Sequence, residues 1–424
     1  MDKHTSKTRW IWILITPVIA ALVFLSVHTA VLPDQIEIFE NETKVIDLGF
    51  PFSVQIDETE PVLQQTDGLE KSDGSFNLTP RQAGESSVTV SLLDTIPLKE
   101  ISVKVLPKAT LIPGGESIGV RMDIKGVVIV GLEDIPVSGG VSVNPGLEAG
   151  LDIGDVILAI DGKEIENSQQ VRDMLNDGGR HRAISLKIKR SDKTKEIQVE
   201  PVLSADENQY RLGLWVRDKT AGIGTLTYYN PQDQSFGALG HAITDPDTGV
   251  LVDVGQGEIL HSRIVSIKQG ASGSPGEVRG VFYETENPMG SLYANTEKGV
   301  FGRAYSEMTQ TLSKEPCEIG YQNEVKKGKA SIFTSIDEGE AKEYEIQIEK
   351  VNRQLTPGTK GMVIQVTDER LLEKTGGIVQ GMSGSPIMQE GKIIGAVTHV
   401  FVNDPTRGYG IFIEWMLKQA KERE

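Results

Sequence analysis

The chain has 424 residues, about three times a usual domain length of roughly 150, so it should hold two to four units that each bury a core. Hydrophobic residues make up 38% of the sequence and charged residues 24%, which excludes a disordered chain, a coiled coil or a collagen. The net charge of −17 would repel a polyphosphate backbone, so nucleic acid is not expected as a partner.

The cysteine and histidine content gives no sign of a disulfide or a metal site. Cys317 is the single cysteine and cannot close an intramolecular disulfide. Neither this thiol nor the six histidines show the C-x-x-C or H-x-x-x-H spacing of zinc ligands. Stability is therefore expected to come from packing, and no metal or other cofactor is expected.

The N-terminal segment predicts a membrane anchor. Residues Trp10–Leu32 run for 23 positions without a charge, which at about 1.5 Å per residue is enough for a helix to span a hydrocarbon core of roughly 30 Å. Lys3, Lys7 and Arg9 precede this run, so the positive-inside rule leaves the N-terminus in the cytoplasm and sends the rest of the chain across. The alternative is a cleaved signal peptide, but its apolar run is usually only about 7 to 15 residues long.

A small β-sandwich is predicted over residues 33–107. This part is acidic and contains stretches of alternating apolar and polar residues, such as Ser87–Leu92 and Ile101–Val105. We interpret it as a spacer after the anchor. The polar stretch Asp57–Ser75 predicts an exposed loop and an easy proteolytic target.

A glycine-punctuated run marks the next unit, residues 108–204. In GLEAGLDIGDVILAIDGKEI, residues 146–165, a turn feeds a buried strand, and Asp161-Gly162 then closes a tight turn. The other predicted elements are a helix capped by Asn167 and running to about Asn176, and strands over residues 184–189 and 196–202. This order resembles a PDZ domain of the bacterial protease type.

Within this unit, Ile118, Gly119 and Val120 look like the loop with which PDZ domains hold a peptide terminus. Such a loop surrounds the carboxylate with backbone N–H groups, and the peptide is added as an extra strand at the sheet edge. The resemblance implies a peptide-binding site here. The alternative is that the segment is only a turn.

Residues 205–424 are strand-rich. From about Leu212 onward, short apolar runs are separated by Gly, Asn, Asp and Pro, and one helix is predicted, from Glu414 to about Glu422. This pattern favours an all-β closed or double-barrel architecture.

A nucleophilic hydrolase needs a hydroxyl or thiol, a base within its reach, and donors for the oxyanion. Among the histidines, only His241, His261 and His399 fall in the C-terminal part. His241 stands in GALGHAITD, where glycines let the backbone come close and leave the ring accessible. The other two sit in apolar, strand-like segments and are interpreted as structural histidines.

A G-x-S-G-x-P pattern occurs twice, around Ser272 and around Ser383. A serine at such a turn exposes its Oγ, and the amides of Gly381 and Ser383 can point together toward a developing oxyanion. Chymotrypsin-like proteases carry their serine in this setting, on the order of 140 residues after the base. His241 precedes Ser383 by 142 positions and Ser272 by 31, so the spacing favours Ser383. Cys317 is disfavoured because its acidic neighbours raise a thiol pKa.

The sequence leaves the third catalytic group open. Five aspartates lie between the base and the nucleophile: Asp245, Asp247, Asp253, Asp337 and Asp368. Asp368 ends an apolar strand, where a carboxylate can be held to orient an imidazole. It lies only 15 residues before Ser383 and can equally be a turn residue. A His–Ser dyad with backbone help is the alternative.

The two C-terminal motifs resemble the stage IV sporulation protein B family of serine peptidases from endospore-forming bacteria. They are GALGHAITDPDTG, residues 237–249, and VQGMSGSPIMQEGKIIGAVTHVFVNDPTRGYGIFIEWML, residues 379–417. With the anchor, spacer and PDZ unit, the resemblance covers nearly the whole chain. It implies that His241 is the base, Ser383 the nucleophile and Asp368 the acid.

The resemblance also implies a role. Members of this family are extracytoplasmic signalling proteases that are made in the forespore and passed into the space between forespore and mother cell. By that logic the protein trims itself and then cuts the regulator of an intramembrane metalloprotease complex, so that a mother-cell sigma factor precursor is processed. The PDZ domain would recognise both the protein itself, for self-cleavage, and its target.

The predicted fold is mainly β. It comprises a cytoplasmic tip and transmembrane anchor (1–32), a β-sandwich spacer (33–107), a PDZ domain (108–204) and a chymotrypsin-like double β-barrel (205–424). The predicted function is a membrane-anchored, self-processing serine endopeptidase. The alternative is a non-catalytic PDZ scaffold, which would need neither an accessible histidine nor a serine turn. An HtrA-type quality-control protease is disfavoured, because those enzymes place the PDZ domain after the catalytic domain.

Overall fold

The computed structural model describes residues 32–40, 44–48, 51–56, 62–65, 75–177, 182–191, 193–337, 341–354 and 356–422. These residues divide into two compact units, with the boundary between Ala109 and Thr110. The predicted membrane span, Trp10–Leu32, lies outside the described residues apart from Leu32. Of the helices that are described, none has the length and apolar character needed to cross a bilayer.

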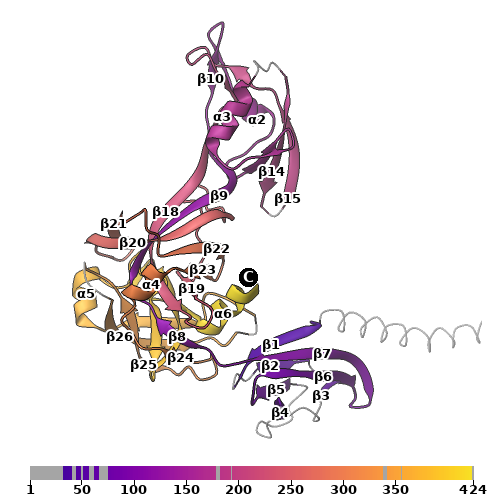
Figure 1. Ribbon diagram of the computed structural model, residues 1–424, viewed down its shortest axis with the longest axis vertical. Helices are drawn as coiled ribbons and strands as arrows, with labels where there is room; N and C mark the ends of the chain where they lie inside the picture. Colours follow the sequence, from indigo (N-terminus) through magenta and orange to yellow (C-terminus); the bar gives the residue numbers. More distant parts are fainter. Residues whose placement is uncertain are drawn as a thin grey trace, which may run out of the picture. The chain divides into compact units, whose positions relative to one another are not determined.

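The first unit consists of two sheets around one apolar core (Figure 1). Leu63 and Leu78 of one sheet belong to the same buried cluster as Ile38, Val88 and Val103 of the other, which is the arrangement of a β-sandwich. The sheet orders are β1-β7-β6-β3 and β2-β5-β4. The strands are β1 (Gln35–Phe39), β2 (Lys44–Asp47), β3 (Phe52–Ile56), β4 (Leu63–Gln65), β5 (Ser75–Pro80), β6 (Gly84–Leu92) and β7 (Ile96–Leu106).

Two strands of 16 residues each organise the second unit: β9 (Ser117–Leu132) and β18 (Leu214–Tyr229). Their pairing runs from Leu214↔Leu132 at one end to Thr225↔Ser117 at the other. The segment between them folds as a separate lobe, and both strands continue from that lobe into the next part of the molecule (Figure 1). The PDZ-like segment is therefore inserted between two strands of the C-terminal architecture, whereas the sequence placed it wholly before residue 205.

The inserted lobe has the elements that the sequence predicted. Helix α3 (Ser168–Asn176) is capped by Asn167, whose side chain accepts a hydrogen bond of 2.9 Å from the Gln170 amide. Val171 and Leu175 of this helix are buried in the lobe's core. The remaining elements are β10 (Ile135–Val137), β11 (Val141–Val143), α2 (Pro145–Glu148), β12 (Val156–Ile160), β13 (Lys163–Glu164), β14 (Ile184–Arg190), β15 (Lys193–Val199), β16 (Val202–Leu203) and β17 (Tyr210–Arg211).

The rest of the second unit contains two rings of six strands, as the double-barrel prediction expected. The first ring has the order β9-β20-β22-β23-β19-β18 and closes because β18 also pairs with β9. The second is a closed barrel with the order β25-β26-β27-β30-β29-β28. The strands are β8 (Thr110–Pro113), β19 (Ser235–Ala238), β20 (Val254–Lys268), β21 (Glu277–Tyr283), β22 (Gly290–Thr296), β23 (Gly299–Ala304), β24 (Cys317–Glu318), β25 (Gly328–Thr334), β26 (Lys342–Val351), β27 (Met362–Val366), β28 (Pro386–Gln389), β29 (Lys392–Phe401) and β30 (Asp404–Phe412).

The described part of this region has more helix than the sequence predicted. The C-terminal helix is present as α6 (Ile413–Glu422), and α4 (Ser306–Thr311) and α5 (Glu369–Thr375) were missed. Helix α5 begins after Asp368, whose side chain accepts from the Arg370 amide, and it ends at Gly376, whose φ is 73°. This pair of caps is a helix signal that the strand-based interpretation overlooked.

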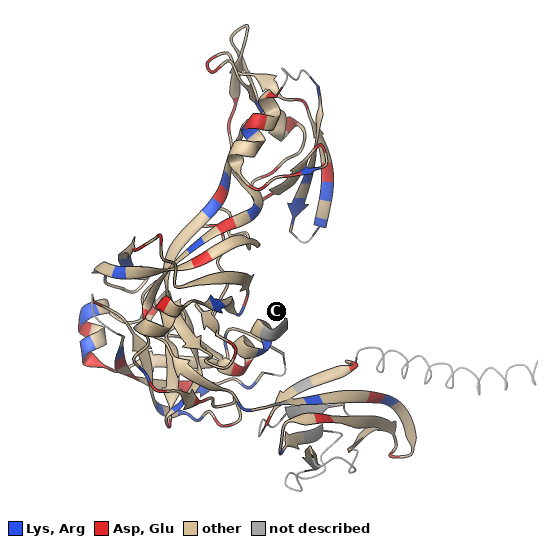
Figure 2. Cartoon of the chain, viewed as in Figure 1, with Lys and Arg blue, Asp and Glu red and all other residues tan. Residues whose placement is uncertain are grey.

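Acidic and basic side chains are interspersed along β9, β18 and the β14–β15 hairpin (Figure 2). In one ion pair the carboxylate is buried: the Asp155 side chain is 1% exposed and accepts two hydrogen bonds of 2.6 Å from Arg190, which is 34% exposed. Another is open to solvent: Lys189 Nζ lies 2.7 Å from Asp253 Oδ2, with exposed fractions of 30% and 50%. Only the first should contribute strongly to stability, because water screens the second.

We predict that Asp155→Ala lowers the free energy of unfolding by about 2–4 kcal/mol, because it strands the Arg190 guanidinium and removes the acceptor of the Asp152 amide. Asp253→Ala is the matched control and should lower the free energy of unfolding by less than about 1 kcal/mol. Urea denaturation followed by tryptophan fluorescence measures both values. Equal losses in the two variants would contradict the prediction.

Candidate active site

A pocket of about 530 Å³ is lined by residues of both barrels. The first barrel contributes His241, which follows β19, and the second contributes Ser383, which precedes β28. The structure thus brings the predicted base and the predicted nucleophile to one cavity, although 142 positions separate them in the sequence.

The turn after β19 directs His241 into the pocket. Leu239 and Gly240 both have left-handed φ values, 68° and 69°, which bend the chain sharply between the strand and the histidine. The ring Nδ1 lies 2.7 Å from the Ala242 carbonyl oxygen. Because a carbonyl can only accept, Nδ1 carries the proton and the lone pair of Nε2 is available as a base. Burial lowers the pKa of His241, while this hydrogen bond acts in the opposite direction.

Asn295 of β22 fixes the chain that follows His241. Its Oδ1 accepts from the Ile243 amide at 2.8 Å, and its Nδ2 donates to the Ile243 and Val252 carbonyls at 2.7 and 2.8 Å. The side chain therefore satisfies both backbone groups of one residue in an irregular segment. The sequence offered no signal that would have singled out Asn295.

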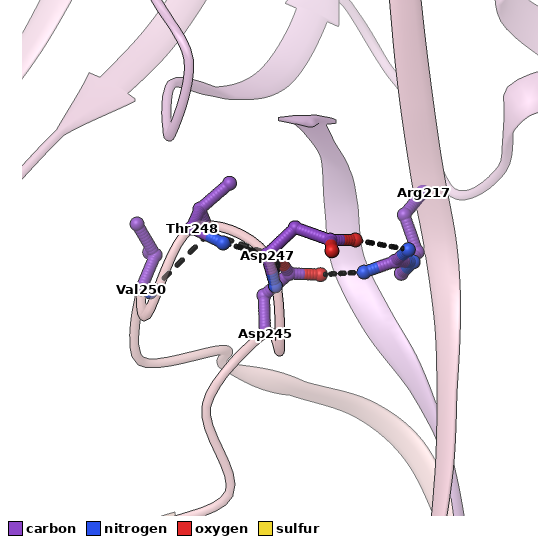
Figure 3. Close-up of polar contacts among 5 residues, drawn as sticks. All are labelled: Arg217, Asp245, Asp247, Thr248 and Val250. Atoms are coloured by element: carbon purple, nitrogen blue, oxygen red, sulfur yellow. Dashed lines mark hydrogen bonds and ion pairs between the residues drawn. The ribbon is translucent and has the colours of Figure 1, made fainter. Parts of the chain in front are cut away.

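Two of the candidate acids, Asp245 and Asp247, hold this same loop (Figure 3). Asp245 is fully buried and accepts from the Thr248 amide and hydroxyl, and both carboxylates accept from Arg217 at 2.6 Å. Thr248 in turn accepts from the Val250 amide. Burial acts to raise the pKa of Asp245, but the hydrogen bonds from Thr248 and Arg217 outweigh it and the pKa is lowered. These groups shape the loop rather than orient the imidazole.

Asp368 is not in the lining of the pocket. Its carboxylate caps α5 and accepts from Arg370 Nε and Nη2, at 3.0 and 2.7 Å, and from the Glu345 amide at 3.2 Å. The hydrogen bonds from Arg370 are the main reason why the pKa of Asp368 is lowered to about 2. The geometry therefore does not support the expectation that Asp368 orients His241, whose Nδ1 is bonded to the Ala242 carbonyl instead. The dyad with backbone help fits better.

The remaining two aspartates are also engaged elsewhere. Asp253 pairs with Lys189, and Asp337 lies 3.2 Å from Lys342 and 3.5 Å from Lys374. Neither residue lines the pocket. None of the five aspartates thus faces the base.

Ser383 stands in a turn between two glycines with left-handed backbone, Gly381 at φ 101° and Gly384 at φ 98°. Its Oγ donates to the Thr398 carbonyl at 3.0 Å, and within the described residues no hydrogen bond joins it to His241. The amides of Gly381 and Ser383 have no acceptor among the described residues, which leaves both able to bind an oxyanion. For attack, the hydroxyl must donate its hydrogen bond to Nε2 instead of to the Thr398 carbonyl.

His399 of β29 was interpreted as a structural histidine, but it is an exposed residue of the pocket wall. Its ring centroid lies 5.3 Å from that of His241. Partial burial, with His241 and Lys360 nearby, lowers the pKa of His399 to about 4. The ring is therefore neutral at pH 7 and adds no positive charge beside the base.

Three other candidates fall outside the site. Ser272 is exposed, and its hydroxyl donates to the Asn403 carbonyl at 2.8 Å. His261 lies in β20, with its ring 5.3 Å from that of Tyr283. Burial raises the pKa of Cys317, which disfavours its thiolate. None of the three lines the pocket that holds Ser383.

Ile118, Gly119 and Val120 do not form a peptide-binding loop. They lie within β9, where Gly119 is opposite Ile223 of β18 on one side and Leu260 of β20 on the other. A Cβ at Gly119 would come within 2.6 Å of the Phe282 ring. The expected peptide-binding site is therefore corrected. The apolar–Gly–apolar pattern here belongs to a strand of the first barrel, and its glycine leaves room for the Phe282 ring.

The inserted lobe has a groove elsewhere, with a volume of about 250 Å³. It lies between α3 and the first residues of β18, and its lining includes Val171, Leu175, Leu214 and Val216. From Leu214 to Arg217, β18 pairs with β9 and with no other described strand, so one edge is open. The preceding Leu212-Gly213-Leu214 repeats the apolar–Gly–apolar pattern, a signal that the sequence interpretation missed.

The comparisons with known proteins fit this geometry. The family described as SpoIVB peptidase S55 matches residues 208–417, and the PDZ domain family matches residues 117–200. No curated protein matches the chain. The sequence resemblance to the stage IV sporulation protein B family is thus confirmed over the first of these ranges.

Solved structures of proteases and PDZ domains show weaker similarity. The PDZ domain of the SdrC-like protein Lmo2051 from Listeria monocytogenes is 19% identical, over 22% of this chain and 87% of that chain, with a TM-score of 0.18. The Rv3671c protease from M. tuberculosis in its active form is 13% identical, over 48% and 74%, with a TM-score of 0.30. The HtrA-type protease AlgW with decapeptide is 12% identical, over 52% and 55%, with a TM-score of 0.28.

We predict that the acid limb of kcat/KM has its midpoint below pH 6.5. The base must be neutral to accept a proton, and because burial lowers the pKa of His241 from its ordinary value of 6.5, the ring stays neutral to lower pH. A pH series with a peptide substrate measures the midpoint. His399→Gln should leave it below 6.5, since burial rather than the second ring lowers this pKa. A wild-type midpoint at or above 6.5 would refute the prediction.

Proposed function

Residues 208–417 belong to the SpoIVB peptidase S55 family, and we propose that this chain is a membrane-anchored, self-processing signalling peptidase that works through Ser383 and His241. The chain is a serine peptidase with a PDZ domain. The observation that carries the site assignment is the single pocket shared by the Ser383 turn and the His241 ring, whose Nε2 is left unprotonated.

The chemistry follows from these groups. Ser383 Oγ attacks the peptide carbonyl carbon while His241 Nε2 takes its proton, and the amides of Gly381 and Ser383 bind the oxyanion. His241 then gives the proton to the leaving amine, and an acyl-enzyme remains. A water molecule, deprotonated by the same nitrogen, hydrolyses the ester. The Ala242 carbonyl keeps the imidazole in the required tautomer throughout.

The groove beside α3 is proposed to take an extended peptide end. An open strand edge offers main-chain hydrogen bonds, and apolar side chains of the helix give a pocket for the last residue. Gly213, at φ 73°, would place a Cβ within 2.6 Å of the Glu133 carbonyl, so the turn before this edge requires glycine.

The biological role is proposed from the family and from the sequence. The protein substrates would be the chain itself and the regulator of an intramembrane protease complex, whose cleavage leads to processing of a sigma factor precursor. The charge-free run Trp10–Leu32 supports anchoring in a membrane with the bulk of the chain outside the cytoplasm, in the space between forespore and mother cell.

We predict that Ser383→Ala in the full chain abolishes self-cleavage and lowers kcat/KM by at least about 10³-fold, because no other hydroxyl replaces the nucleophile. His241→Ala should act similarly. Ser272→Ala is the matched control, since it removes the serine of the duplicate motif, and it should process normally. Intact-mass spectrometry of purified protein follows the cleavage. Processing by Ser383→Ala would overturn the nucleophile assignment and favour a non-catalytic scaffold.

We predict that Leu214→Lys weakens binding of a peptide with an apolar C-terminus by about tenfold or more, because it puts a charge into the apolar groove. Trp215→Lys is the control: it lies next along β18, is 60% exposed and does not line the groove. Fluorescence anisotropy with a labelled hexapeptide ending in valine measures the affinity, and its C-terminal amide tests recognition of the carboxylate. Equal affinities in the two variants would place the peptide site elsewhere.

A further inference from the structure

A buried threonine of the first barrel holds the nucleophile turn of the second. Thr225, on β18, is 2% exposed. Its Oγ1 donates to the Gly381 carbonyl at 2.8 Å, and its amide donates to the Ser383 carbonyl at 3.1 Å. One residue thus contacts both residues whose amides are assigned to the oxyanion.

These contacts fix peptide planes that glycine alone would leave free. The amide of Met382 donates to the Val379 carbonyl at 3.1 Å. At φ 101°, Gly381 lies in a region where glycine pays no steric penalty, so on this side little besides that hydrogen bond keeps the peptide unit from Gly381 to Met382 from turning over. The Thr225 hydroxyl opposes this, because turning the unit over would take the Gly381 carbonyl away from its donor. This unit joins the two peptide units that carry the Gly381 and Ser383 N–H groups, so holding it restricts the dihedral angles through which those groups can move relative to each other.

The seam between the barrels is closely packed at this point. A Cβ on Gly384 would lie 2.2 Å from the Thr225 carbonyl oxygen and 2.5 Å from the Leu239 nitrogen. The Thr225 carbonyl itself accepts from the Leu239 amide at 3.2 Å, at the start of the turn that carries His241. Thr225 therefore touches the turns that carry both catalytic groups.

We propose that Thr225 is a positioning residue, which holds the Gly381–Ser383 turn so that its two amides face the reacting carbonyl. It does not touch the substrate. The inference rests on Ser383 being the nucleophile. On this proposal, the Thr225 hydroxyl increases the rate of acylation and does not affect the binding of substrate.

The test compares Thr225→Val, which replaces the hydroxyl by a methyl group of similar size, with Thr225→Ser, which keeps the hydroxyl. Thr227→Val is the matched control. It makes the same exchange two residues along β18, at a fully buried hydroxyl that has no hydrogen-bond partner among the described residues. Active-site titration with a fluorophosphonate counts the competent sites, so that kcat refers to folded enzyme, and urea denaturation reports stability.

In Thr225→Val we expect kcat per titrated site to fall by about 10- to 100-fold with KM within about twofold, because the loss falls on stabilisation of the oxyanion. Thr225→Ser should recover to within about threefold of the wild type, and Thr227→Val should match the wild type. The proposal is overturned if Thr225→Val equals Thr227→Val in kcat, or if Thr225→Ser is as impaired as Thr225→Val. Activity in Ser383→Ala would instead overturn the nucleophile assignment itself.

Discussion

The pairing of β9 with β18, in two stretches on either side of an irregularity near Asp218, is the constraint on which the second unit depends. These two strands close the first barrel, and their far ends belong to the core of the inserted PDZ lobe. Ile118 and Val120 of β9 are buried in the core of the barrel, whereas Val127 and Ile129 are buried in the core of the lobe. The irregularity between Arg217 and Lys219 moves the buried positions of β9 from even to odd residue numbers, so one pair of strands serves two cores with two registers.

The same strand β18 also contacts the segments that carry both candidate catalytic residues. Arg217 binds Asp245 and Asp247 in the loop after His241, and eight residues further on Thr225 binds the turn of Ser383. At about 3.3 Å per residue, roughly 26 Å of strand separates the two contacts. The proposed base and nucleophile come from different barrels, yet their turns are bonded to one strand. The groove of the PDZ lobe begins at Leu214, three residues before the first of these contacts.

Local pattern was enough to predict much of this molecule. Asn167 with its helix, the two strand-rich regions and the turn of Ser383 follow from short-range periodicity and glycine placement. Flanking glycines selected His241 over the other histidines, and spacing then selected Ser383 over Ser272. Three expectations differ from the structure for one reason: contacts between segments far apart in the sequence determine where these residues lie, and a local pattern does not show such contacts. Ile118–Val120 lies between two strands, His399 faces a cavity that both barrels line, and Asp368 is used as a helix cap. The insertion of the PDZ segment is likewise visible only when residues 117–132 pair with residues 214–229.

The carbonyl that accepts from His241 cannot do everything that a catalytic carboxylate does. A carboxylate would both fix the tautomer and stabilise the imidazolium that forms when the serine is deprotonated. The Ala242 carbonyl fixes the tautomer but carries no net charge, so stabilisation of the imidazolium must come from other groups. A lowered pKa for His241 also makes it a weaker base toward Ser383. If His241 is the base, the oxyanion site then has to supply a larger share of the rate. In the proposed mechanism this gives weight to the orientation of the Gly381 and Ser383 amides, and hence to the Thr225 hydroxyl that holds their turn.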